Sequence, residues 1–208
     1  MPDELPPPKP QDILFSSSVK AAQERLGSRT MFAQRTEWRT EITEDVRQYL
    51  AAIDMFFIAT ASRDGQPYVQ HRGGPPGFLT VLDERTLGFA DLGGNRQYIT
   101  VGNLAENTRA FLFVPHLATR QRLKFWGRAR SVEDDGVLLA RLAMRGYPGR
   151  IERAVIFDVE VWDSNCQSHI TARYSEAEIA PAIDKLVARI KELEAEVAAL
   201  REGRSGNS

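Results

Sequence analysis

The pattern of apolar and polar residues predicts a mainly β domain in the middle of the chain. Residues 55–61 are apolar and rich in β-branched and aromatic side chains, and a second strand is predicted at 68–72 after a turn at 64–67. Further strands are predicted at 78–82, 86–90, 110–114, 123–130 and 155–162. Because six or seven strands have few helices between them, the pattern favours a small β-barrel over a parallel βαβ sheet.

Two of the predicted strands carry a tryptophan on a polar face. Side chains alternate between the two faces of a strand, so in 123–130 Trp126 shares its face with three cations: Lys124, Arg128 and Arg130. In 155–162 the same alternation places Trp162 on the face opposite Val159. Tryptophans are more often core or interface residues than ligand contacts, but a polar face strengthens the case for binding.

Helical patterns flank these strands. Helices are predicted at 17–27, at 43–53 with Thr43 as the N-cap, at 96–106 and at 134–143. The proline-rich residues 1–12 favour an extended or disordered start. The predicted organisation is an N-terminal arm with a short helix (1–40), a barrel domain (41–174), a helix (175–202) and a disordered tail (203–208).

The helix at 175–202 has a strict heptad repeat. Its apolar residues are spaced alternately by four and three: Ile179, Ile183, Leu186, Ile190, Leu193, Val197 and Leu200. Ser175 and Glu178 match a capping box at its start. The stripe fits either an amphipathic helix that lies on its own barrel or a coiled coil with a second subunit. Three heptads are marginal alone, so such a coil would assist a dimer made elsewhere.

Composition narrows the class of protein. The chain has 208 residues, 42% hydrophobic and 26% charged, with a net charge of -1, which argues against a nucleic-acid binder. No apolar run approaches the roughly 20 residues that span a bilayer. The single cysteine, Cys166, and three histidines form no metal-binding pattern, so no metal and a cytoplasmic location are expected.

Two glycine-rich turns, each with an arginine, indicate a phosphate site. The first is residues 72–78, beginning Arg72-Gly73-Gly74, and the second is Gly93-Gly94-Asn95-Arg96. Glycines let backbone amides converge on an anion, and the arginine guanidinium suits phosphate oxygens. Neither turn fits the dinucleotide fingerprint or the P-loop. The alternative is that both arginines lie on the surface at ordinary turns, and in either case the fold is expected to persist without them.

These motifs support a family resemblance. The stretch 54–129 resembles the pyridoxamine 5'-phosphate oxidase-like, FMN-binding split-barrel proteins, and the likeness extends over about residues 17–175. It is strongest for an uncharacterised branch with the same two turns. The resemblance implies a mainly β split barrel that forms a homodimer with two FMN molecules in the subunit interface. It also implies a set of cofactor contacts: Arg72, Asn95 and Arg96 at the phosphate and ribityl chain, Gly73, Gly74 and Phe78 along the flavin, and Tyr98, Arg122 and Trp126 nearby.

The segment 162–173 is similar to the closing segment of the family. By this resemblance Trp162 and Arg173 reach the flavin of the partner subunit. His169 falls near a position that contacts substrate in the true oxidases, which makes it the candidate catalytic residue, as a general acid or a substrate ligand. The spacing is one residue longer in this chain.

One departure from the family bears on the reaction. True pyridoxamine phosphate oxidases carry Arg-x-x-Leu-Leu-Lys where this chain has residues 72–78, and their Ser-Arg-Lys turn corresponds to residues 98–100. Because those lysines are absent, vitamin B6 phosphate is not the expected substrate. The resemblance implies an FMN-dependent oxidoreductase that transfers hydride or electrons to or from a nicotinamide or another small molecule. The alternatives are a non-catalytic flavin carrier or sensor, and a haem or deazaflavin binder on the same fold.

Overall fold

The computed structural model describes residues 9–35, 37–164 and 168–205, with side chains up to residue 201. Its described residues form two compact units. One contains the chain up to His116 together with Gln121–Ser168, and the other contains Leu117–Arg120 and the chain from His169 onward. The predictions for residues 1–8, for Cys166 and for the tail beyond residue 205 lie outside the described residues.

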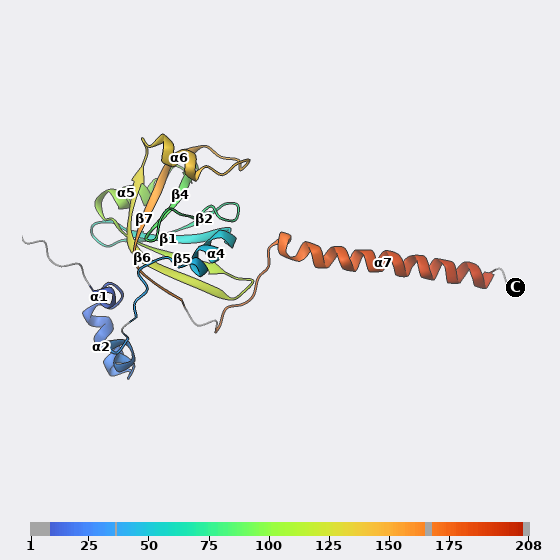
Figure 1. Ribbon diagram of the computed structural model, residues 1–208, viewed down its shortest axis with the longest axis horizontal. Coiled ribbons are helices and arrows are strands. Elements are labelled where there is room, and N and C mark those ends of the chain that lie inside the picture. Colours follow the sequence, from blue (N-terminus) through green and yellow to red (C-terminus); the bar gives the residue numbers. More distant parts are fainter. Residues whose placement is uncertain (1–8, 36, 165–167, 206–208) are drawn as a thin grey trace, which may run out of the picture. The chain divides into compact units, whose positions relative to one another are not determined.

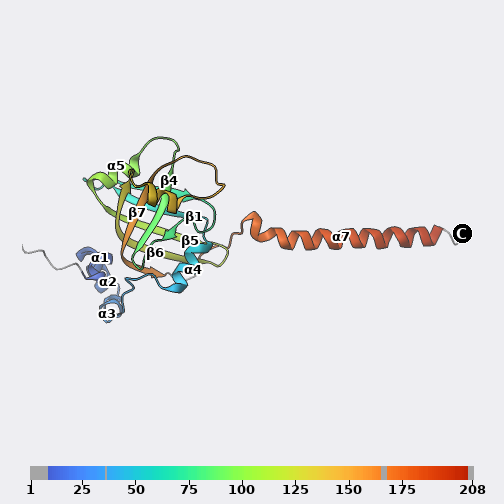
Figure 2. The same cartoon turned by 45° about the horizontal axis from the view of Figure 1, so that its top comes forward.

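The first unit is a curved antiparallel sheet that confirms the predicted split barrel. In the described part of the chain, seven strands follow the order β2-β1-β5-β6-β7-β4-β3, and both views show them curling around a common interior (Figures 1 and 2). The strands are β1 Met55–Ala61, β2 Pro67–Gly73, β3 Thr80–Val81, β4 Thr86–Leu92, β5 Arg109–His116, β6 Gln121–Val132 and β7 Ile151–Ser164.

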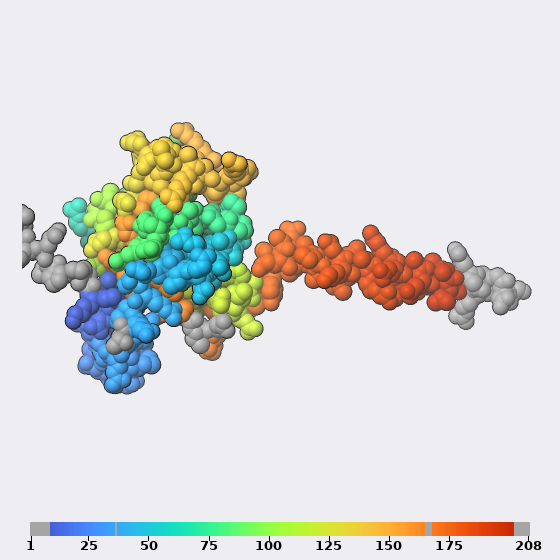
Figure 3. Space-filling model, viewed as in Figure 1, coloured from blue at the N-terminus to red at the C-terminus, as the bar shows by residue number. Residues whose placement is uncertain are grey.

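Short helices accompany the sheet. They are α1 Pro10–Leu14, α2 Ser17–Arg25, α3 Arg29–Ala33, α4 Glu44–Ala52, α5 Ile99–Glu106 and α6 Gly136–Leu142. The helix α4 buries Val46 and Leu50 against the core and lies next to the green β3–β4 segment (Figure 3). Ser16 caps α2 by accepting a hydrogen bond from the Val19 amide at 3.3 Å, whereas the Thr43 side chain makes no capping hydrogen bond at α4.

The second unit is dominated by α7, Glu176–Ser205. The predicted capping box is present, because the Ser175 amide donates to Glu178 Oε2 at 2.7 Å and the Glu178 amide donates to Ser175 Oγ at 3.3 Å. No helix in the described residues is both long enough and apolar enough to cross a membrane.

The strand predicted at 78–82 pairs only over Thr80–Val81. The chain before it turns instead: the Phe78 amide donates to Pro75 O at 3.0 Å, and Gly77 has a left-handed φ of 85°. Phe78 is buried and stacks on Phe56, with 5.4 Å between the ring centroids. Packing of this aromatic pair therefore takes the place of strand pairing.

The predicted face of Trp162 is wrong, because β7 contains a bulge. The β6–β7 register shifts between Trp126 and Gly127, which leaves Glu160 as an extra residue in β7. Beyond a bulge every side chain changes face. Trp162 therefore lies in the core, 6% exposed, with its ring 6.2 Å from that of Phe125.

Candidate functional site

The two predicted arginine turns meet around a small cavity of about 190 Å³. We call it the arginine cavity. It brings together four of the predicted cofactor residues, Arg72, Asn95, Arg96 and Tyr98, which lie on β2 and on the turn that leads into α5. The remaining wall comes from β2, the end of β4, the start of α5 and the start of β7: Tyr68, Gln70, Asp91, Leu92, Gly94, Gln97, Ile99, Thr100, Val101, Glu152 and Arg153.

A buried carboxylate holds two arginines in this cavity. Asp91 accepts hydrogen bonds from Arg72 through Oδ1 and from Arg153 through Oδ2, the latter at 3.1 Å. The three side chains are only 7%, 14% and 11% exposed, respectively. Arg153 also pairs with Glu133 at 3.0 Å and with Glu152 at 3.3 Å. Asp91, Arg72 and Arg153 are therefore mostly buried charges, and each has an oppositely charged partner in this ion-pair cluster.

Arg72 keeps one donor unused. Its Nε is buried and has no hydrogen-bond partner among the described residues, although Nη1 is bound to Asp91. Leaving such a donor unpaired is costly, and a ligand acceptor would remove the cost. The expectation that the fold would persist without Arg72 is not supported, because removing it would leave Asp91 with one partner fewer.

The turn before α5 is strained at two non-glycine positions. Arg96 has a φ of 61° and Tyr98 a φ of 51°, both left-handed. Such conformations cost roughly 1–2 kcal/mol each for residues with a Cβ and are concentrated at functional sites. The Asn95 side chain stabilises the turn by accepting a hydrogen bond from the Gln97 amide at 3.1 Å. Within the described part of the chain, the exposed guanidinium of Arg96 has no hydrogen bond or ion pair.

The amino end of α5 faces the same cavity. The first amides of a helix have no intrahelical acceptor and carry partial positive charge, and Ile99, Thr100 and Val101 supply them here. Three guanidinium groups and two carboxylates line the cavity, which gives 3 − 2 = +1. Burial disfavours the Arg153 cation, but hydrogen bonds to Glu133 and Asp91 outweigh it and raise its pKa above the usual value. The cavity is therefore suited to an anion.

Sequence reasoning missed Asp91 and Arg153. Asp91 is the one charged residue of β4, and a lone charge in an apolar strand is the signal that could have identified it. Arg153 carries no such signal, because β7 contains several acidic residues as well. What the sequence does not contain is their pairing, because the two residues are 62 positions apart.

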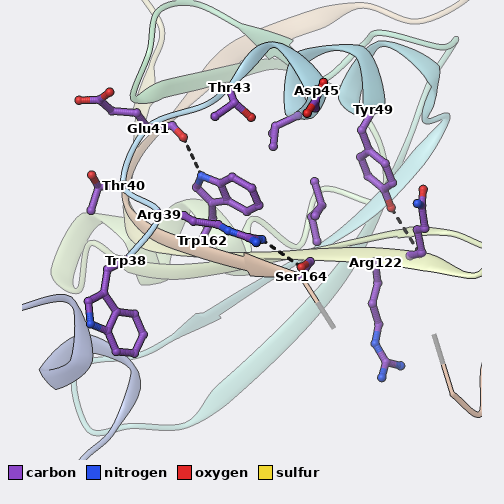
Figure 4. Close-up of a pocket in the computed structure, with 13 residues that line it drawn as sticks. Trp38, Arg39, Thr40, Glu41, Thr43, Asp45, Tyr49, Arg122, Trp162 and Ser164 are labelled. Carbon is purple, nitrogen blue, oxygen red and sulfur yellow. Dashed lines mark hydrogen bonds between the residues drawn. The ribbon is translucent and has the colours of Figure 1, made fainter. Parts of the chain in front are cut away.

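A larger cavity of about 850 Å³ contains Arg122 and Trp162. Figure 4 shows the Trp162 indole directed at Glu41 and the Arg39 side chain lying across it, while Arg122 points away from this group. The indole Nε1 donates to Glu41 O at 2.7 Å, and the Arg39 guanidinium lies 4.8 Å from the ring centroid. The Nε of Arg122 is buried without a partner among the described residues.

Tyr49 closes one side of the larger cavity. Its hydroxyl donates to Val114 O at 2.8 Å. Burial disfavours the phenolate and raises the Tyr49 pKa well above its ordinary value, although a backbone hydrogen bond at His116 lowers it slightly. Tyr49 is therefore a neutral hydrogen-bond donor at physiological pH.

The other predicted residues are dispersed. Gly73 and Gly74 follow Arg72, and Phe78 is a core residue that lines neither cavity. Trp126 lies on the outer face of the sheet in a third cavity of about 350 Å³, with its ring 4.9 Å from that of Phe111. Lys124, one of the three cations predicted on the face of Trp126, lies 5.1 Å from the Trp126 ring. Arg173 and the candidate catalytic His169 are exposed residues of the second unit.

The fold is that of a split-barrel protein, and a cavity with an excess of positive charge lies between β2 and α5. The family model described as pyridoxamine 5'-phosphate oxidase matches residues 42–192, and the chain belongs to this family. No curated protein matches the chain.

Several solved structures are similar to the chain at low sequence identity. HupZ of Group A Streptococcus is 18% identical, with a TM-score of 0.50 over 64% of this chain and 99% of that chain. An F420 reductase is 18% identical, with a TM-score of 0.41 over 59% and 98% of the two chains. HutZ, the haem storage protein of Vibrio cholerae, is 14% identical, with a TM-score of 0.39 over 57% and 89%. At these identities the likeness concerns the fold alone.

Proposed function

We propose that the chain is an FMN-binding oxidoreductase that works as a homodimer. The observation that carries the proposal is the arginine cavity. There Arg96 has no hydrogen bond or ion pair with the described residues, Arg72 has an unused buried donor and α5 presents its amino end. These are the groups that bind a phosphate dianion in proteins. Their location in a member of the pyridoxamine 5'-phosphate oxidase family favours the phosphate of FMN.

The size of the arginine cavity supports an FMN site that is divided between two subunits. Complete small-molecule sites enclose about 300–1,000 Å³, whereas the arginine cavity encloses about 190 Å³. That volume suits a phosphate and part of the ribityl chain but not a three-ring flavin. The ring would then lie outside the cavity, where a second copy of the chain can cover it. This division accounts for the separation of Arg122 and Trp162 from the arginine cavity within one chain.

The contacts of the charged residues support a role for each of them in this proposal. Arg96 and the Nε–H of Arg72 would bind the phosphate, and the amides at the amino end of α5 would add donors. Asp91 holds Arg72 and Arg153 in place, and its carboxylate balances part of their positive charge when no ligand is bound. FMN supplies hydride and electron transfer when it is bound. His169 remains the candidate general acid or substrate ligand.

The outer face of the sheet supports a homodimer. Phe57 pairs with Phe113, and Phe111 pairs with Trp126, so aromatic side chains from β1, β5 and β6 form one surface. All four are only partly buried in the single chain. Aromatic residues are enriched in protein interfaces, and monomers rarely expose an apolar surface of this kind.

Cofactor retention tests the proposal. We would mix the purified protein separately with FMN, haem and deazaflavin, desalt it, and record the absorbance spectrum and sedimentation of each sample. We expect retention of one FMN per chain in a dimer. Retention of haem or deazaflavin without FMN would contradict the proposal, and so would a monomer with stoichiometric FMN.

Turnover then separates an enzyme from a carrier. NADH or NADPH should reduce the bound flavin, and oxygen or a quinone should oxidise it over many cycles. A protein that retains FMN but shows no multiple turnover would be a flavin carrier or sensor. In that case the cofactor assignment would stand and the oxidoreductase assignment would not.

A further inference from the structure

The helix α7 presents an apolar seam that the described residues of its unit leave exposed. The seam side chains are between 40% and 69% exposed: Ile179, Ile183, Leu186, Ile190, Leu193, Val197 and Leu200. Apart from Pro181 and Val187, the other positions from 176 to 201 are polar residues and alanines, and Figure 3 shows α7 as a single rod of side chains. A helix of this length in water owes most of its stability to the packing of such a face.

The residue types of the seam indicate how many helices the coiled coil contains. With Ile179 at heptad position d, the a positions are Ile183, Ile190 and Val197, and all three are β-branched. The later d positions are all leucine: Leu186, Leu193 and Leu200. In parallel coiled coils, β-branched residues at a with leucine at d favour two strands over three or four.

The flanking charges specify a parallel arrangement. In a parallel pair each g residue meets the e residue five positions later in the partner helix. Arg189 at g would meet Glu194, and Glu196 at g would meet Arg201. Both contacts join opposite charges, and the symmetry of a dimer doubles each of them. In a single chain Arg189 pairs along its own helix with Glu192 at 2.8 Å, where both side chains are exposed.

An antiparallel arrangement of the two helices would make fewer favourable contacts with the same residues. It would set a positions against d positions, with Ile183 facing Leu200. Glu194 would then lie opposite Val187, so one of the two favourable charge contacts would be lost. The β-branched and leucine layers would also be mixed.

We propose that α7 pairs with α7 of a second copy as a parallel, in-register, two-stranded coiled coil. The heptad spacing indicates a coiled coil, the side chains at a and d favour two helices, and the charges at e and g favour the parallel orientation. The proposal does not depend on the identity of the cofactor.

Disulfide trapping in the full-length protein tests the arrangement. Cys166 is first replaced by serine, so that the introduced cysteine is the only one in the chain. A disulfide needs Cα atoms about 4.4–6.8 Å apart, a separation that facing seam positions provide. In a parallel dimer the two copies of position 200 face each other. In the antiparallel dimer they would be 17 residues, or roughly 25 Å, apart.

We expect Leu200→Cys to form a covalent dimer on mild oxidation roughly tenfold faster than Ala199→Cys, its matched control on the outer face of the helix. A mixture of Ile183→Cys and Leu200→Cys chains should yield few mixed dimers. Equal rates for Leu200→Cys and Ala199→Cys would overturn the coiled coil. Mixed dimers as the main product would overturn the parallel arrangement.

Discussion

Replacing Asp91 by asparagine is the sharpest test of the buried ion-pair cluster. The substitution keeps the shape of the side chain and removes its charge. Arg72 would lose its only ion-pair partner among the described residues, while Arg153 would keep Glu133 and Glu152. Both lost contacts are buried, because the side chains of Arg72 and Arg153 are only 14% and 11% exposed.

The expected cost follows from the number of hydrogen bonds. Asp91 accepts two charge-assisted bonds, each worth about 1.5–3 kcal/mol. The asparagine carbonyl can still accept one weaker bond, which favours the lower end of that range. We expect a loss of about 3 kcal/mol, which agrees with the about 3–5 kcal/mol measured when a buried pair is broken.

Urea unfolding measures this loss. With a denaturant dependence of about 2 kcal/mol per molar urea, the midpoint should fall by about 1.5 M. Asp158→Asn is the matched control, because Asp158 pairs with Arg130 where both side chains are about half exposed, at 49% and 54%. That control should cost under about 1 kcal/mol. Equal midpoints for the two variants would refute the view that the cluster stabilises the fold. Added phosphate should also stabilise Asp91→Asn more than the parent, because an anion can replace the lost carboxylate.

Three further predictions concern the bulge, a buried phenol and α7. Gly127→Ala would place a Cβ 2.0 Å from a backbone oxygen of β7, so it should cost about 3 kcal/mol in urea unfolding, whereas Gly102→Ala, with open space around it, should not destabilise; equal effects would contradict the bulge geometry. The raised pKa of Tyr49 means that stability is fully present below the unfolded value of about 10 and is lost as pH rises toward the higher folded value. Tyr49→Phe should therefore flatten the loss of stability at alkaline pH, and an unchanged alkaline slope would be evidence against a buried neutral phenol. Leu186→Asp with Leu193→Asp should lower the melting temperature of the full-length dimer, and a parent-like melt would show that the seam is not packed.

Local patterns were enough to predict most of the secondary structure. The predicted strand 55–61 matches β1 at both ends, because a run of apolar β-formers ends in a turn with strong local preferences. The heptad helix was equally clear, since its period extends over three repeats. In both cases the signal lies within one element and needs no distant partner.

The bulge could not be predicted, because it depends on pairing between strands. Glu160 continues the alternation of polar and apolar residues in β7, and only its register against Gly127 shows that it is an extra residue. The close approach of the two backbones at Gly127 requires a glycine there. That single residue reverses the face of Trp162 and moves it from the predicted polar surface into the core.

The site was predicted in part for a similar reason. Arg72 and Arg96 were identified because glycine-rich turns mark them in the sequence. Asp91 and Arg153 come from strands that meet only in the folded sheet, so their role as the centre of the ion-pair cluster was not visible. The assignment of flavin contacts to Phe78 stays a prediction, and the burial of that side chain in the core does not favour it.

The most direct test of the central claim is a comparison of FMN and riboflavin binding, since the two ligands differ by the phosphate alone. Binding to the parent protein would be compared with binding to Arg96→Ala and to Arg120→Ala, a control that also removes an arginine from a left-handed position, with a φ of 55°. If Arg96 binds the phosphate, Arg96→Ala should weaken FMN binding by about 10- to 100-fold, equivalent to about 1.5–3 kcal/mol for a charged hydrogen bond. Arg96→Ala should leave riboflavin binding unchanged, and Arg120→Ala should leave the binding of both ligands unchanged. An equal loss for both ligands, or no loss for FMN, would contradict the assignment of the arginine cavity as the phosphate site.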